Sequence, residues 1–137
     1  MRTIRQSFDR ARRGRFAEHF YALLLEQSEA IRGTFRNTDF DRQRDLFVHG
    51  VYSILDYAEG KPLGRMAIER LAATHGPGGL RVGPAMLDTW TDCFIEALGQ
   101  SDPELDDSLA KKWRETLAIA LNRMRAAHPV AARARRA

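Results

Sequence analysis

His75 is the residue of this 137-residue chain best suited to bind a metal-containing group. The run Gly76-Pro77-Gly78-Gly79 follows it directly and forbids further helix, so we expect His75 to stand at a helix end. The last carbonyls of such a helix can orient one ring nitrogen while the other binds iron. A haem iron needs only one such protein ligand and can leave its opposite face open. The alternative is that His75 is an ordinary surface or capping residue.

The sequence lacks the motifs by which proteins without a cofactor catalyse reactions. It contains no glycine-rich phosphate loop, no His-Glu-x-x-His motif and no Gly-x-Ser-x-Gly turn. The single cysteine, Cys93, cannot form an internal disulfide and lies among Trp90, Phe94 and Ala97. A buried, inert thiol is the expected state there, and a catalytic thiol is the alternative. This cysteine usage fits a cytoplasmic location.

The net charge of +4 comes from the two ends of the chain. Residues 1–15 carry six arginines against one aspartate and residues 130–137 carry three arginines, so residues 16–129 are mildly acidic. We therefore predict basic terminal segments exposed to solvent rather than a nucleic-acid-binding surface. No run of 18 apolar residues predicts a membrane span, and the N-terminus lacks the apolar stretch of a signal peptide.

Prolines and glycines divide the chain into helices, because all five prolines fall between segments whose apolar residues recur every three or four positions. We expect a single domain over 1–137, with a basic N-terminal helix or arm over 1–14 and a frayed basic tail over 128–137. No alternating pattern indicates a strand. The first expected helices span 1–13, which Gly14 ends, and 15–26, and a short turn capped by Ser28 follows. Next comes a long helix that Thr38 or Asp39 caps and that Gly60 and Pro62 close. The remaining helices are 63–74, with Met66, Ile68 and Leu71 inward, 84–99, and a last helix that Ser101 or Asp102 opens with Pro103 at its first position.

Five stretches then occur in a specific order along the chain. They are His19-Phe20-Tyr21, residues 31–43 from Ile31 to Gln43, Leu71-Ala-Ala-Thr-His75, Pro84 with Trp90, and Trp113. In this order and spacing the chain resembles the single-domain bacterial globins and is similar to the globin half of flavohaemoglobins, over residues 8 to about 127. The resemblance implies an all-α, globin-like fold of about six to seven helices around a haem b pocket. It also implies oxygen or another diatomic gas as the ligand.

The resemblance also assigns individual residues to that pocket. It implies His75 as the proximal iron ligand, Phe35 packed on the porphyrin, and Tyr21, Gln43 and Phe47 on the gas side, with Leu71, Arg81, Val82 and Leu87 as further contacts of the haem. Arg81 would pair with a haem propionate, the alternative being simple solvation. Phe47 is larger than the aliphatic residue usual at its position in these globins. The simpler alternatives are that Phe35 and Tyr21 are core residues and that Gln43 is solvated.

The types and spacing of the gas-side residues suit the binding of oxygen. Gln43 and Phe47 lie one helical turn apart and are expected to face the same way. Oxygen bound to a ferrous haem carries partial negative charge, which the Tyr21 O–H and the Gln43 amide N–H can stabilise as hydrogen-bond donors. Each such bond contributes roughly 1.5–3 kcal/mol, so slow oxygen release is expected.

Two departures from flavohaemoglobins limit the expected chemistry. The resemblance places a proximal tyrosine and a late-helix glutamate there, where they polarise the histidine, but Leu87 and Val130 occupy these positions here. With no reductase domain expected either, oxidative chemistry on nitric oxide would need an external reductase. The leading hypothesis is a gas-binding haem protein, with a homodimer left open. A haem-free, globin-shaped signalling or interaction module is the second, and a helical nucleic-acid binder acting through the terminal arginines is the third.

Overall fold

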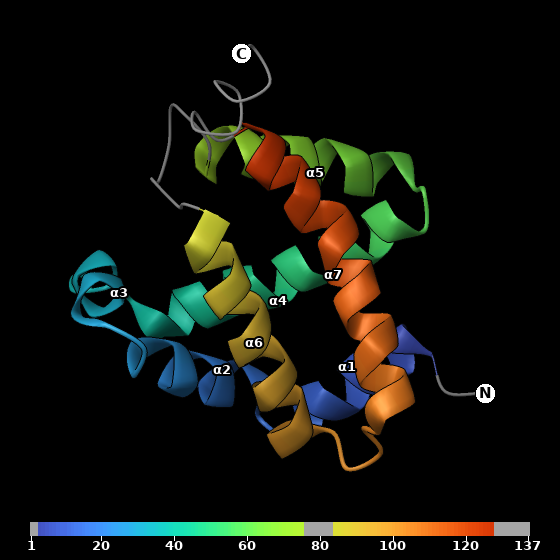
Figure 1. Cartoon of the computed structure of the whole chain (residues 1–137), viewed down its shortest axis with the longest axis horizontal. Helices are drawn as coiled ribbons and strands as arrows, with labels where there is room; N and C mark the ends of the chain where they lie inside the picture. The colour runs from blue at the N-terminus through green and yellow to red at the C-terminus, as the bar shows by residue number, and fades with distance from the viewer. Residues whose placement is uncertain (1–2, 76–83, 128–137) are drawn as a thin grey trace. The chain divides into compact units, whose positions relative to one another are not determined.

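The computed structural model describes residues 3–75 and 84–127, which form α-helices joined by short connections (Figure 1). Within these residues there is no strand, as the sequence predicted. No helix among them is long and apolar enough to cross a lipid bilayer. The helices are α1 (Ile4–Arg13), α2 (Phe16–Leu25), α3 (Glu29–Thr34), α4 (Phe40–Ala58), α5 (Pro62–His75), α6 (Pro84–Ser101) and α7 (Asp107–Ala127).

The chain forms two compact units. The first unit consists of Met1–His49 and Thr89–Arg114, and the second of Gly50–Asp88 and Glu115–Ala137. Helices α4, α6 and α7 each contribute one part to each unit. The prediction of one domain over the whole chain stays a prediction.

Local capping sets the starts of three helices. Thr3 begins α1 with a capping box, in which its side chain accepts from the backbone N–H of Gln6 and the Gln6 side chain accepts from that of Thr3. Ser28 caps α3, as predicted, by accepting the N–H of Ile31. Of the two predicted caps for α4, Asp39 is the one whose side chain accepts backbone N–H groups of the first turn.

Gly14 ends α1, as predicted, at a place where α1 approaches the end of α6 closely. A Cβ atom at position 14 would lie 2.2 Å from the carbonyl oxygen of Ser101, so no larger residue fits without a backbone shift. The next residue, Arg15, has a left-handed backbone with φ of 63°, and this conformation turns the chain into α2.

Aromatic side chains make up the core of the first unit. Phe16 and Phe20 of α2 stack on Phe47 of α4, with ring centroids 5.7 and 4.4 Å apart. Phe94 of α6 lies 4.8 Å from Phe16 and 5.2 Å from Trp113 of α7. All five side chains are buried. Such ring pairs stabilise a fold by about 0.5–1.5 kcal/mol each beyond their burial, so this aromatic core holds α2 against α4 and α6.

The last helix begins later than the sequence predicted. The prediction placed its start at Ser101 or Asp102 with Pro103 as the first helical residue, but α7 begins at Asp107. The side chain of Asp106 accepts the N–H of Leu109 and is the actual cap. Asp102 does accept the N–H of Glu104, but residues 103 and 104 form only a turn that does not continue into the helix.

Asp102 is the centre of a buried polar network. Its side chain is inaccessible to solvent and accepts hydrogen bonds from Ser7 Oγ at 2.7 Å, from Arg10 Nε at 2.6 Å and from the backbone N–H of Glu104 at 3.0 Å. The indole N–H of Trp113 donates to Ser7 Oγ at 2.9 Å. The prediction that the N-terminal arginines are solvated is therefore wrong for Arg10, whose side chain is only 14% exposed.

In the second unit, α5 buries the face formed by Gly64, Ile68 and Ala72. These residues are four positions apart and therefore lie on one side of the helix. The prediction that Ile68 faces inward is confirmed, but the same prediction for Met66 is wrong, because Met66 is 59% exposed. Two residues that are two positions apart lie about 200° apart around a helix, so Met66 and Ile68 cannot both face the core.

An ion pair joins α5 to α7 within the second unit. Arg123 donates two hydrogen bonds to the carboxylate of Glu69, at 2.9 and 2.6 Å. Both side chains remain partly exposed, so this pair contributes little to stability.

Candidate functional site

Tyr21 of α2 and Gln43 of α4 are joined by a hydrogen bond in the first unit. The side-chain N–H of Gln43 donates to the Tyr21 hydroxyl oxygen over 3.0 Å. Because the oxygen accepts this bond, the hydroxyl proton can be donated to a further group. Tyr21 is buried, as the alternative of a core residue also expects, and Gln43 is half-buried.

The environment keeps the Tyr21 phenol protonated. Burial raises the pKa of Tyr21 above its ordinary value, and this effect outweighs the opposing effects of the Gln43 hydrogen bond and the positive charge of Arg44. The phenol is therefore a neutral donor across the physiological pH range. A neutral donor in a poorly solvated place can stabilise partial negative charge on a small molecule.

Four phenylalanine rings surround the Tyr21 ring. The centroids of Phe20, Phe35, Phe40 and Phe47 lie 5.1, 5.8, 5.7 and 5.4 Å from that of Tyr21. Phe47 is buried, whereas Phe35 and Phe40 are half-buried and keep apolar surface exposed. Gln43 and Phe47 both contact Tyr21, which confirms that they share one face of α4. The structure thus brings together four of the predicted gas-side and porphyrin residues, which we call the tyrosine pocket: Tyr21, Phe35, Gln43 and Phe47.

The other predicted site residues belong to the second unit or are not described. His75 is the last residue of α5, as expected from the glycine-rich run after it, but its side chain lies outside the described residues. Arg81 and Val82 lie outside them entirely. Leu71 is half-buried on α5, and Leu87 is buried near the start of α6.

The described residues offer neither a bare metal site nor a reactive thiol. Nowhere in this part of the chain do three His, Cys, Asp or Glu side chains gather as metal ligands. Cys93 is buried, and burial, together with the negative charges of Glu96, Asp92 and Glu26, raises the pKa of its thiol. The predicted burial of Cys93 is confirmed, and a raised pKa disfavours the reactive thiolate.

Comparisons with known proteins give one informative result. Models of protein families and curated proteins yield no match. Among solved structures, the chain is similar to a protein from Pseudomonas aeruginosa PAO1 described as structurally highly homologous to a human hemoglobin. The TM-score is 0.85 at 25% sequence identity, covering 91% of this chain and 95% of that one. The chain has a globin-like fold.

This result confirms the predicted fold class. Seven helices in the described residues agree with the six to seven expected of an all-α, globin-like chain. The likeness supports the globin-like fold in general and gives no support to a particular closeness to flavohaemoglobins.

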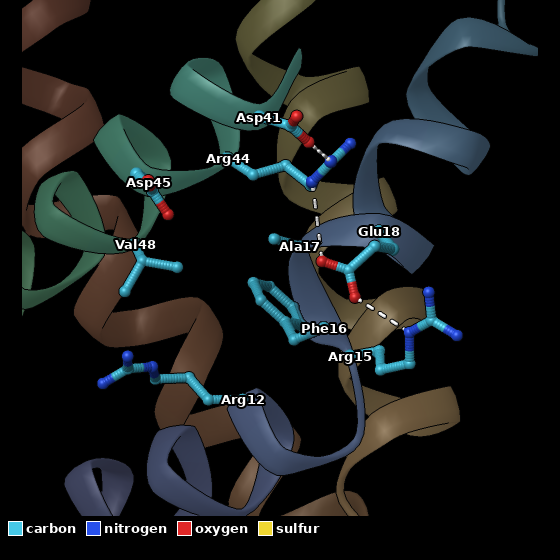
Figure 2. A pocket seen from close by; sticks show the side chains of 9 residues that line it. All are labelled: Arg12, Arg15, Phe16, Ala17, Glu18, Asp41, Arg44, Asp45 and Val48. Carbon is cyan, nitrogen blue, oxygen red and sulfur yellow. Dashed lines mark hydrogen bonds and ion pairs between the residues drawn. The ribbon is translucent and has the colours of Figure 1, made fainter.

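The sequence analysis did not predict two features of the first unit. One is the Asp102 network, whose partners Ser7 and Arg10 lie 95 and 92 positions away in sequence. The other is a surface cleft of about 340 Å³ beside α2 and α4 (Figure 2). Neither has a local sequence signal, because each depends on contacts between separate helices.

Proposed function

We propose that this chain is a cytoplasmic globin that binds haem b and reversibly binds oxygen or another diatomic gas. The observation that carries the proposal is the hydrogen bond from Gln43 to the buried Tyr21 hydroxyl inside a ring of phenylalanines. The globin-like fold and the similarity to a haemoglobin-like protein support it. The position of His75 at the end of α5 supports it as well.

The residues present fit a haem group. The half-buried rings of Phe35 and Phe40 offer apolar surface that a flat macrocycle would cover, beside a protonated phenol. In this proposal His75 holds the iron, Phe35 packs on the porphyrin, and Leu71 and Leu87 line it, with Val82 at its edge and Arg81 paired with a propionate. When bound, the haem would supply an iron able to bind a diatomic gas.

The residues of the tyrosine pocket have separate tasks in binding the gas. Tyr21 donates its O–H to the gas molecule, and Gln43 orients the hydroxyl by donating to its oxygen. Phe47 and Phe20 stack 4.4 Å apart and keep water from the inner side of the tyrosine ring. Storage, sensing and nitric oxide chemistry with an external reductase are all functions that such a pocket serves.

The test is an absorption spectrum of the protein produced with added haem, reduced and then exposed to oxygen or carbon monoxide. We expect a Soret band that shifts with each gas in the wild type and is lost or grossly altered in His75→Ala. His49→Ala, at an exposed position of α4, is the matched control and is expected to leave the spectrum unchanged. A wild-type protein that stays colourless and takes up no added haemin would refute the proposal and favour a haem-free signalling module.

A further inference from the structure

A cleft of about 340 Å³ opens in the first unit between the α1–α2 corner and the first half of α4 (Figure 2). Its rim is charged and its floor is apolar. The rim consists of Arg12, Arg15, Glu18, Asp41, Arg44 and Asp45, and the floor of Phe16, Ala17 and Val48. We call it the α2–α4 cleft.

The rim does not favour a charged ligand. Its three arginines are balanced by three carboxylates. Arg44 pairs with Asp41 and also with Glu18, which in turn binds Arg15 at 3.2 Å, as the dashed lines in Figure 2 show. Because Arg15, Glu18, Asp41 and Arg44 are paired and the rim as a whole carries no net charge, an anion or a cation gains little by entering. The α2–α4 cleft instead suits a small, neutral, apolar molecule that reaches the floor.

The floor of the cleft is linked to the tyrosine pocket by contacts between aromatic rings. The Phe16 ring points toward Val48 across the cleft, and the residue is fully buried (Figure 2). The Phe16 ring also stacks on Phe47 at 5.7 Å with an interplanar angle of 19°. Phe47 in turn meets the Tyr21 ring at 5.4 Å. Ring contacts through Phe16 and Phe47 therefore connect the floor of the cleft to Tyr21.

We propose that the α2–α4 cleft is the access route by which a diatomic gas reaches Tyr21, with the stacked rings of Phe16 and Phe47 as its gate. The proposal rests on the proposed gas-binding function and extends it from the bound state to the path of the gas. Side-chain motions on the ps–ns timescale and slower open transient space for a small apolar molecule. The fully buried Phe16 excludes water and ions, because removing their hydration costs much free energy.

A route and a hydrogen bond affect binding kinetics differently. The cleft contacts the gas only in transit, so narrowing it slows association and dissociation by the same factor and leaves the equilibrium constant unchanged. Tyr21 acts on the bound gas and therefore changes mainly the dissociation rate. The two contributions can be separated by measuring both rate constants.

The kinetic experiment uses the haem-loaded full chain and Val48→Trp, which fills the cleft from its half-buried floor position. We expect carbon monoxide association and dissociation each to slow by about three- to tenfold. Val48→Ala widens the cleft and is expected to speed both rates. This variant still tests the access route if Val48→Trp does not fold. Leu46→Trp is the matched control, because Leu46 lies on the same helix but is 54% exposed and does not line the cleft.

A second readout does not depend on gas binding at the haem. Xenon enters apolar spaces in proteins, so xenon pressure is expected to shift the methyl NMR signals of Ala17 and Val48 but not those of Leu46. The absence of these shifts, or rates that match the wild type in both Val48 variants, would overturn the access route. If the wild type binds no gas at all, the proposed function falls and the route falls with it, whereas normal binding with unchanged rates refutes the route alone.

Discussion

Removing the arginine that neutralises the buried carboxylate is expected to destabilise the fold strongly. Arg10 binds Asp102 through two contacts, Nε to Oδ1 at 2.6 Å and Nη2 to Oδ2 at 3.1 Å. The Asp102 side chain has no solvent exposure, so it cannot gain water in compensation. Arg10→Met keeps the aliphatic stem of the side chain and removes only the charged fork.

The magnitude follows from the burial of the carboxylate. Breaking one partner of a buried ion pair costs about 3–5 kcal/mol, because an uncompensated charge remains. The lower end applies here, since Ser7 and the N–H of Glu104 still donate to Asp102. For 137 residues the entropy of unfolding is about 0.3 kcal/mol/K, so a loss of about 3 kcal/mol lowers Tm by roughly 10 °C.

The pH dependence gives a second check on the same pair. Burial acts to raise the pKa of Asp102, but hydrogen bonds from Arg10, Ser7 and Glu104 outweigh it and hold the pKa below its ordinary value. Stability from this carboxylate is therefore present above the unfolded-state pKa of about 3.9 and is lost as the pH falls through the folded-state value. In Arg10→Met the pKa rises, so Asp102 is protonated sooner on acidification and the stability difference from wild type shrinks.

The assay is thermal and urea unfolding followed by far-UV circular dichroism at neutral and acidic pH. Arg114→Met is the matched control, because its pair with Asp92 is exposed and is expected to contribute less than about 1 kcal/mol. Adding Asp102→Asn to Arg10→Met removes the buried charge and is expected to recover part of the loss. If the free energy of unfolding of Arg10→Met lies within about 0.5 kcal/mol of the wild-type value at neutral pH, the buried-charge argument is refuted.

Three further outcomes are expected. Tyr21→Phe keeps the ring contacts but removes the donor, so stopped-flow oxygen release should speed by about tenfold to a hundredfold; an unchanged rate would remove Tyr21 from the proposed gas contact. Gly14→Ala drives a Cβ against the Ser101 carbonyl and should cost about 1–3 kcal/mol in urea unfolding, so an unaffected protein would contradict the close approach of α1 and α6. Glu69→Gln breaks only the partly exposed pair with Arg123 and should change Tm little, and a large loss would show that the pair is better shielded than its exposure indicates.

Several helix boundaries were predicted from local signals, although the local caps Thr3 and Asp106 were missed. Ser28 and Asp39 cap their helices through their own neighbours, and Gly14 ends α1 where the sequence indicated. Predictions of the buried face were wrong where packing between helices, and not the local sequence pattern, decides which side chain is buried. Met66 and Ile68 fit an inward face equally well by hydrophobicity, and only the burial of α5 selects Ile68.

The candidate site was predictable only through resemblance to a family. Tyr21 and Gln43 are 22 positions apart, and no spacing rule within one helix connects them. Their hydrogen bond depends on α2 packing beside α4, which the stacked rings of Phe20 and Phe47 maintain. The predicted start of the last helix was wrong for a related reason. Asp102 caps only the turn at Glu104, and it also binds Ser7 and Arg10, which lie more than 90 positions away in the sequence.

Asp102 and Tyr21 are buried polar residues of different kinds in the first unit, and the difference separates stability from binding. The Asp102 oxygens accept from Ser7, Arg10 and Glu104, all within the chain, and buried polar groups satisfied in this way fix a fold. The Tyr21 hydroxyl accepts from Gln43 and keeps a proton that its raised pKa prevents it from losing. A donor of that kind, set among half-buried aromatic rings, is suited to an acceptor from outside the chain, which is why the gas-binding proposal rests on Tyr21 rather than on the stronger network around Asp102.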